Sequence, residues 1–295
     1  MRPPGTLKYT IRLALGFRVS EKEQLSEEVL VKPEKLKNLE EIIRPLGQVI
    51  VAYSGGVDSS LLLKVALDVL GKENVEAVIA SSATYPSREK ADAVRFCESI
   101  GAPFSVIETD EMEDARFIEN TPQRCYICKS HLYEEILKIA RSRGSRAVLE
   151  GSNVDDLRDY RPGRKAIEEK GIVSPLKEAG LTKGEIRAIS LELGLPTHSR
   201  PAKACLASRI PYHTKIERET LSRIERGEDL LEALGFGQVR IRCHGEVARI
   251  EVEPGEMEKV FREREAIVKG LSKLGFRYVT ADLQGYRTGS LNEAL

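Results

Sequence analysis

The stretch Val49-Ile50-Val51-Ala52-Tyr53-Ser54-Gly55-Gly56-Val57-Asp58-Ser59 joins a short apolar run to a turn rich in glycine and serine. Residues 49–53 are typical of a buried strand, and residues 59–70 place apolar side chains at helical spacing. A strand, a glycine turn and a helix in direct succession predict an α/β fold whose first loop approaches a ligand closely.

The turn has the composition of a loop that binds phosphate. Its glycines remove Cβ clashes, and the helix that follows offers unpaired N–H groups and the positive end of its dipole to an anion. Hydroxyls add hydrogen bonds, and the carboxylate of Asp58 can hold Mg²⁺ against the phosphates. The loop lacks the Gly-Lys-Ser/Thr ending of a Walker A loop and the third glycine of a dinucleotide fingerprint. The alternative is a simple strand–turn–helix junction with serine caps. The nucleotide contacts that we predict here are Ala52, Ser54, Gly55, Gly56, Asp58 and Ser59.

Strands and helices continue to alternate up to about residue 200. Thr182 and Glu185 form a capping-box pattern at the start of the last helix of this part. Alternation of this kind predicts right-handed crossovers and a parallel sheet covered by helices on both faces. The further strands are predicted at 75–80, 104–107 and 147–149, and the further helices at 87–100, 129–143 and 182–194.

The pattern changes after residue 200 to one helix, a hairpin, a second helix and a last strand, which indicates a separate small α+β domain. The helices are predicted at 216–234 and 255–274, and the strands at 238–243, 247–252 and 278–283. We therefore predict an N-terminal extension (1–38), a nucleotide-binding domain (39–204) and a C-terminal domain for substrate binding and oligomerisation (205–295).

Two loops follow strands at the edge where ligands bind in open α/β sheets. Ser81 ends the second strand and is predicted to contact the nucleobase or ribose, the alternative being an ordinary strand exit. Gly151 and Asn153 follow the fourth strand and face the same crevice, and Asp156 adds a carboxylate for Mg²⁺. The alternative for this second loop is a solvated acidic turn.

The composition excludes several classes of protein. Among 295 residues, 46 Lys and Arg balance 46 Asp and Glu, which argues against a general nucleic-acid binder. Aromatic residues make up 5%, with no Trp, so a stacking platform for single strands is not expected. The sequence has no apolar run of membrane-spanning length and no secretory signal pattern. We therefore predict a cytoplasmic protein with no membrane or nucleic-acid partner.

Five cysteines in a cytoplasmic chain are expected to be thiols, metal ligands or nucleophiles rather than disulfides. Cys125 and Cys128 form a CxxC between the third strand and a helix. The pair could be half of a zinc site, a redox dithiol, two ligands of an iron–sulfur cluster, or incidental. Arg124 and Lys129 flank the pair and are expected to favour the thiolate form.

Cys205 lies in a loop between the two predicted domains. The neighbouring cations Lys203 and Arg209 are expected to favour its nucleophilic form, and the alternative is a small buried filler. Cys97 and Cys243 are predicted to be packing residues, the second of them in the core of the small domain.

Arg240 and Arg242 share one face of a predicted strand, where two guanidiniums can grip a phosphate. The alternative is a solvated strand face. Glu251 and Glu253 share a face of the next strand and could bind a metal or pair with those arginines.

The glycine loop resembles the PP-loop of the ATP pyrophosphatase family over residues 45–200, and several segments together resemble the LarE family over residues 35–292. LarE proteins are ATP-dependent sulfur transferases that mature the nickel-pincer nucleotide cofactor of lactate racemase. The segments that carry this resemblance are Ser54–Ser59, Arg124-Cys-Tyr-Ile-Cys-Lys129, Glu150-Gly-Ser-Asn-Val-Asp-Asp156, the Cys205 loop, Val239-Arg-Ile-Arg242 with His244-Gly245, and Asp282-Leu-Gln-Gly-Tyr-Arg287 with Gly289-Ser290.

The resemblance implies a two-part reaction. ATP adenylates a carboxylate of pyridinium-3,5-biscarboxylic acid mononucleotide, and a sulfur nucleophile then displaces AMP to leave a thiocarboxylate. The sulfur comes either from a cysteine that becomes dehydroalanine, or from sulfide on a [4Fe-4S] cluster held by three cysteines. The implied catalytic residues are Cys205 and Asp58. The resemblance further implies a homo-oligomer.

By the same resemblance, Cys125, Cys128 and Cys205 are the thiols of the cluster branch, which we favour. The implied substrate-phosphate contacts are Ser208, Arg209, Arg240 and Arg242, and the candidate ligands of Mg²⁺ or another divalent cation are Asp58, Asp156 and Glu251. Two other functions remain open: a tRNA 2-thiolation enzyme with the same ATP loop, and an ATP-binding regulatory module without turnover.

Overall fold

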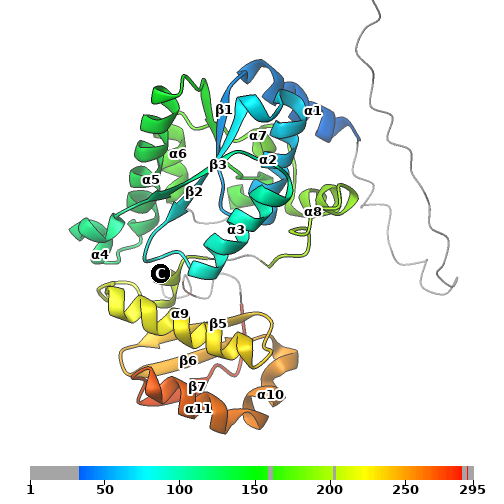
Figure 1. Ribbon diagram of the computed structural model, residues 1–295. Coiled ribbons are helices and arrows are strands. Elements are labelled where there is room, and N and C mark those ends of the chain that lie inside the picture. Colours follow the sequence, from blue (N-terminus) through cyan, green and yellow to red (C-terminus); the bar gives the residue numbers. More distant parts are fainter. Residues whose placement is uncertain (1–32, 159–161, 202–203, 288–290, 292–295) are drawn as a thin grey trace, which may run out of the picture.

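The computed structural model describes residues 33–158, 162–201, 204–287 and 291, and its two sheets each carry their own helices (Figure 1). Most of the predicted N-terminal extension, together with Lys203 and Gly289-Ser290, lies outside the described residues. The larger sheet follows from the strand–turn–helix alternation of the sequence, and it confirms the prediction of an α/β fold.

The larger sheet has four parallel strands in the order β3-β2-β1-β4. Val51 of the central strand β1 is in register with Ala77 of β2 and Leu149 of β4. Because β1 is buried between two neighbours, its unbroken apolar run is what a parallel strand requires. The strands are β1 (Val49–Ala52), β2 (Val75–Ser81), β3 (Phe104–Glu108) and β4 (Ala147–Leu149).

Helices cover both faces of this sheet, as the sequence predicts. Val49 and Val51 point to a core shared with five helices, whereas Ile50 points to the opposite core, shared with two. The first group comprises α1 (Pro33–Ile43), α2 (Val57–Leu70), α3 (Ser87–Ser99), α7 (Pro175–Glu178) and α8 (Lys183–Glu192). The second group comprises α5 (Arg124–Ser142) and α6 (Gly163–Glu169). The alternation of side chains along one strand thus separates the two layers.

The smaller sheet has the order β5-β6-β7, with β5 antiparallel to β6 and β6 parallel to β7. Cys243 lies in the core of this sheet, as predicted. The same core includes Phe117 and Ile127 from the first part of the chain. This shared core packs the smaller sheet against α5 and the segment around Phe117. The elements are α9 (Arg218–Ala233), β5 (Val239–His244), β6 (Val247–Val252), α10 (Met257–Arg262), α11 (Arg264–Lys273) and β7 (Tyr278–Ala281), and α4 (Ala115–Ile118) packs beside them.

Two sequence-based predictions about helices are wrong. The helix predicted over 255–274 is two helices separated at Glu263, and the break keeps both Val260 and Ile267 against the core. The helix predicted to follow the CxxC begins at Arg124, so Cys125 and Cys128 lie on one face of its first turns. The described residues also include short 3-10 helices at Arg44–Leu46, Lys72–Asn74, Glu111–Glu113, Val154–Arg158, Leu206–Arg209 and Pro254–Glu256.

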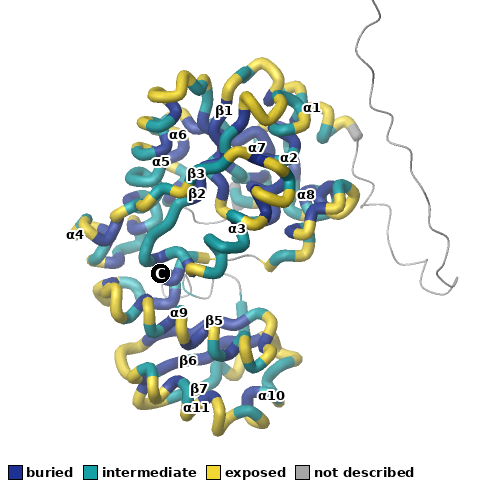
Figure 2. Tube along the Cα trace, viewed as in Figure 1, coloured by how far each residue is buried: buried dark blue, intermediate teal, exposed yellow. Residues whose placement is uncertain are grey.

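Figure 2 shows the buried residues gathered in the strands and on the helix faces that meet them. Within the part of the chain that the structure describes, no helix combines the length and the apolar character needed to cross a membrane.

Two helical glycines give a matched test of this packing. A Cβ on Gly227 of α9 would lie 2.6 Å from Cδ1 of Ile241 and 3.0 Å from Cδ2 of Leu271, whereas one on Gly184 of α8 would meet nothing within 4 Å. We expect Gly227→Ala to lower the free energy of unfolding by about 1–3 kcal/mol through overpacking. Gly184→Ala should leave it unchanged or raise it by up to about 1 kcal/mol. Urea unfolding followed by circular dichroism measures both, and equal stability of the two variants would contradict the packing described.

Candidate active site

A cleft of about 460 Å³ lies at the carboxyl ends of the parallel strands. Ala52, Ala80, Thr109 and Gly151 line it and come from or directly follow the ends of β1, β2, β3 and β4, the edge where an open α/β sheet binds ligands. Its wall also contains Ser54, Gly55, Gly56, Val57, Asp58, Ser59, Ser152, Asp156, Cys128 and Cys205. The glycine loop and two of the predicted cysteines therefore face one cavity.

The glycine loop is shaped for an anion. Gly55 has φ +72°, a left-handed conformation that glycine adopts without strain. Ser59 Oγ accepts a hydrogen bond from the N–H of Ser54 at 3.3 Å and lies 3.1 Å from Ser54 Oγ, so the two serines hold the turn closed. No side chain caps helix α2 at Gly56, which leaves the first N–H groups of the helix to a ligand.

Asp58, predicted to bind Mg²⁺, is held by two side chains. Lys183 Nζ forms an ion pair with one of its oxygens, and Asn153 Nδ2 donates to the other at 3.2 Å. Lys183 also lines the cleft. The sequence places Lys183 directly after the Thr182 cap, but nothing in it indicates that this helix end lies beside Asp58.

Of the remaining predicted ATP contacts, Gly151 and Asn153 reach the glycine loop or Asp58, whereas Ser81 does not line the cleft. Gly151 lies so close to the loop that a Cβ on it would be 3.0 Å from the backbone N of Ser59. Asn153 reaches the site through Asp58, as above. Ser81 Oγ accepts a hydrogen bond from Lys90 at 3.1 Å, and it is the flanking residues Ala80 and Ser82 that line the cleft.

Two side chains that sequence reasoning missed also line the cleft and hydrogen-bond to the backbone of the glycine loop. The hydroxyl of Tyr85 donates to the carbonyl of Ser54 at 2.5 Å, and Arg200 Nη1 donates to the carbonyl of Gly55 at 3.0 Å. The carbonyl of Thr84, the neighbour of Tyr85, accepts from the N–H of Leu206 at 2.8 Å. One short segment after β2 thus contacts both the glycine loop and the residue that follows Cys205.

The cysteine end of the cleft is more buried than the sequence suggests. Burial raises the pKa of Cys125, with a further rise from Cys205, and outweighs the lowering by Arg124 and Lys129. Burial also raises the pKa of Cys128, assisted by the charge of Glu111. The flanking cations do favour the thiolate form, as expected, but burial outweighs them and the pKa of both cysteines is raised.

Glu111 is a further residue that the sequence did not single out. Its side chain lines the cleft at 1% exposure, and one oxygen accepts from Thr84 Oγ1 at 2.7 Å while the other has no partner. Across the described residues, no three His, Cys, Asp or Glu side chains are arranged to hold a single metal ion.

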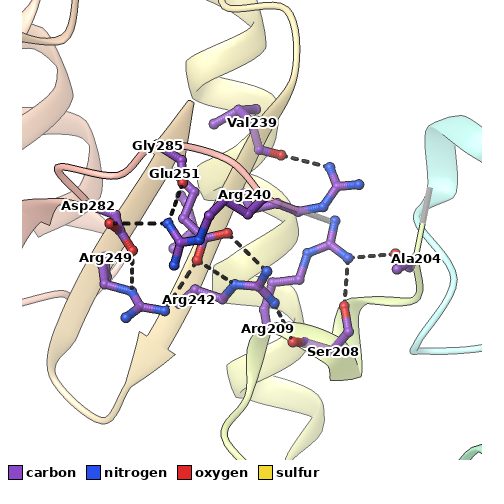
Figure 3. Close-up of polar contacts among 12 residues, drawn as sticks. Ala204, Ser208, Arg209, Val239, Arg240, Arg242, Arg249, Glu251, Asp282 and Gly285 are labelled. Atoms are coloured by element: carbon purple, nitrogen blue, oxygen red, sulfur yellow. Dashed lines mark hydrogen bonds and ion pairs between the residues drawn. The ribbon is translucent and has the colours of Figure 1, made fainter. Parts of the chain in front are cut away.

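The predicted substrate-phosphate residues lie together at the edge of the smaller sheet (Figure 3). Arg240 and Arg242 are each 7% exposed, so they are not a solvated face. Arg242 donates to both oxygens of Glu251 at 2.9 Å and to the carbonyl of Ser208 at 2.7 Å. Of the two roles that the sequence left open for Glu251, the structure shows the pairing with arginine.

Arg209 makes different contacts from Arg240 and Arg242. It is 2% exposed and donates to both oxygens of Glu228 at 2.9 Å. Its Nη1 also donates to the carbonyls of Ala204 and Cys205, the second at 3.1 Å. Arg209 therefore holds the Cys205 segment rather than presenting its guanidinium to a phosphate.

Comparison with known proteins assigns the chain to a family. The NAD synthase family matches residues 36–146. Glutamine-dependent NAD(+) synthetase of Aquifex aeolicus is 32% identical over 113 residues, which cover 38% of this chain and 20% of the relative. An uncharacterised protein of Synechocystis sp. is 42% identical over 263 residues, which cover 88% of this chain and 98% of the relative.

A third relative extends over nearly the whole chain and has a named activity. Pyridinium-3,5-bisthiocarboxylic acid mononucleotide synthase of Lactiplantibacillus plantarum is 40% identical over 253 residues, which cover 86% of this chain and 92% of the relative. The glycine loop at the head of α2 and this similarity across both sheets lead to one conclusion. The chain belongs to the LarE family of ATP-utilising PP-loop enzymes.

Proposed function

We propose that this enzyme is an ATP-dependent sulfur transferase that converts a carboxylate of pyridinium-3,5-biscarboxylic acid mononucleotide into a thiocarboxylate. One observation carries the proposal: the glycine loop and the thiols Cys128 and Cys205 line the same cleft. An acid activated at one end of this cavity can therefore be attacked by sulfur without leaving it.

The first half of the reaction needs ATP and Mg²⁺. The uncapped N–H groups of α2 bind the phosphates, and Asp58 with Asp156 supplies oxygen ligands for the cation. A carboxylate oxygen of the substrate attacks the α-phosphorus, the bond to the bridging oxygen breaks, and pyrophosphate leaves. Lys183, which pairs with Asp58 on the wall of the cleft, places a positive charge beside these phosphates.

The second half needs sulfur. A sulfur nucleophile attacks the acyl carbon, and AMP leaves with the electrons of the carbon–oxygen bond. Cys205 is the residue that either gives up its own sulfur or, with Cys125 and Cys128, holds a [4Fe-4S] cluster, and we favour the cluster. The donor set suits this group, because thiol sulfurs are its ligands and the charges of Cys125, Cys128 and Cys205 act on one another, so the three side chains lie near one another. When bound, the cluster would supply sulfide.

The nucleotide phosphate of the substrate binds at the arginine edge of the smaller sheet. Arg240, Arg242 and Ser208 supply the contacts, and the pair of Arg209 with Glu228 keeps the Cys205 loop beside them. We further propose that the enzyme works in the cytoplasm, where its thiols stay reduced, and as a homo-oligomer.

Asp58→Asn tests the ATP half. We expect the release of pyrophosphate with ATP and the biscarboxylate substrate to fall at least about 100-fold, since a cation ligand beside the leaving group is lost. A coupled pyrophosphate assay measures the rate. Asp68→Asn, at the far end of the same helix, is the control and should keep wild-type turnover. Turnover by Asp58→Asn at the wild-type rate would remove the metal role of Asp58.

Cys205→Ala tests the sulfur half. We expect AMP and pyrophosphate to form with no thiocarboxylate detected by mass spectrometry, because adenylation does not use this thiol. Cys243→Ala, in the core of the smaller sheet, is the control and should leave the sulfur transfer intact. Full sulfur transfer by Cys205→Ala would refute both sulfur routes.

The two sulfur routes are separated by iron analysis of protein purified without oxygen. About four irons per chain and an absorbance lost on substitution of Cys125 support the cluster. Iron-free, active protein in which Cys205 has become dehydroalanine after turnover contradicts the cluster and assigns the sulfur to Cys205.

A further inference from the structure

Two side chains from distant parts of the chain hold neighbouring carbonyls of the glycine loop. The hydroxyl of Tyr85, which follows β2, donates to the carbonyl of Ser54 at 2.5 Å. Arg200, which follows α8, donates from Nη1 to the carbonyl of Gly55 at 3.0 Å. The two pairs are 31 and 145 positions apart in the sequence, so the tertiary structure alone brings these donors to the loop.

The next carbonyl along the loop is held by the helix itself. The carbonyl of Gly56 accepts from the N–H of Ser60 at 3.0 Å and from Ser59 Oγ at 3.2 Å, both in α2. Three successive peptide units are thus held by their carbonyls, one by the helix and two by Tyr85 and Arg200.

A held carbonyl also fixes the N–H of the same peptide unit. The unit is planar and trans, so its N–H points opposite to its C=O. The bond to the carbonyl of Ser54 therefore sets the direction of the N–H of Gly55, and the bond to the carbonyl of Gly55 sets that of Gly56. In the part of the chain that the structure describes, neither N–H has a protein acceptor, so both are available to an anion.

Without these two donors the peptide units would be free to turn over. Gly55 has φ +72° and no Cβ to resist such a flip. A flipped unit presents a carbonyl oxygen to the phosphates in place of an N–H. The freedom that lets the tight turn form is therefore what Tyr85 and Arg200 restrict.

Both holding side chains are themselves fixed. Arg200 Nη2 pairs with Asp92 of α3 at 3.3 Å, and the backbone carbonyl of Arg200 accepts from Arg187 at 2.7 Å. Tyr85 is half-buried, and burial raises the pKa of its phenol. Its hydroxyl therefore stays protonated at neutral pH and remains a donor.

We propose that Tyr85 and Arg200 are positioning residues of the adenylation step, which aim two N–H groups of the glycine loop at the phosphates of ATP by holding the carbonyls of the same peptide units; this rests on the proposed function. Dipoles that are aimed in advance need no reorganisation as negative charge builds up on the leaving pyrophosphate. In this role neither side chain has to touch the nucleotide.

Tyr85→Phe tests the first donor, because it removes the hydroxyl and keeps both the ring and the net charge. Calorimetry on the full-length protein compares ATP, pyrophosphate and AMP. We expect ATP and pyrophosphate to bind at least about fivefold more weakly, and AMP, which lacks the β- and γ-phosphates, to bind unchanged. Tyr278→Phe, at an exposed position of β7, is the control and should bind all three ligands like the wild type.

Arg200→Lys tests the second donor with its charge retained. A single ammonium group cannot reproduce the fork that holds Asp92 and the carbonyl of Gly55 together, so we expect the same weaker binding of ATP and pyrophosphate. Arg95→Lys is the matched control. Arg95 also pairs with Asp92 and forms no bond to the described glycine loop, so its substitution should leave all three affinities unchanged.

Steady-state kinetics separates positioning from a general loss of structure. With the biscarboxylate substrate, both variants should lower kcat/KM for ATP at least about fivefold and leave the KM for the biscarboxylate unchanged. Circular dichroism and urea unfolding confirm that each variant is folded.

Two results overturn the inference. One is wild-type affinity for ATP and pyrophosphate in both variants. The other is an equal loss of affinity for AMP and ATP, which shows that the substitutions loosen the whole cleft. A single variant with wild-type affinity removes its own residue from the role.

Failure of the proposed function is read separately. A wild type that binds ATP but forms no thiocarboxylate refutes the sulfur transferase, and the calorimetric comparison of the variants still decides the role of Tyr85 and Arg200. A wild type that does not bind ATP refutes both.

Discussion

The site depends on one constraint, the free N-terminus of helix α2 at the edge of a parallel sheet. The helix starts at an uncapped glycine, so its first N–H groups stay available for an anion. The loop after β4 packs closely on this turn, since a Cβ on Gly151 would lie only 3.0 Å from the backbone N of Ser59. That contact brings Asn153 to Asp58.

A second constraint fixes the Cys205 segment to helix α9. Arg209 and Glu228 form a buried ion pair. Burial alone would raise the pKa of Glu228, but the charge and hydrogen bonds of Arg209 lower it by more, so the carboxyl stays ionised. The same guanidinium binds the carbonyl of Cys205. Removal of either partner would leave a buried charge without compensation, which costs about 3–5 kcal/mol. The position of Cys205 is thus tied to α9, which packs on the smaller sheet.

Sequence pattern was enough for the strands, because an apolar run such as 49–53, followed directly by a glycine turn, is typical of a strand buried in a parallel sheet. It failed where burial depends on contacts distant in sequence. The start of α5 at Arg124 was missed, since Arg124 is buried by Asn120 and Tyr212 rather than by apolar periodicity. The break at Glu263 was missed because both halves have helical composition.

The sequence by itself determined the strand–loop–helix unit, the family to which its motifs point and the residue types of the site. These features follow from the spacing of residues along the sequence, because the period of a strand or a helix fixes which side chains share a face. Only the tertiary structure decided the partners: Lys183 on Asp58, Tyr85 and Arg200 on the glycine loop, and burial rather than nearby charge as the main influence on Cys125. Each of these results joins segments far apart along the chain, and desolvation depends on the surrounding atoms, which no single segment specifies.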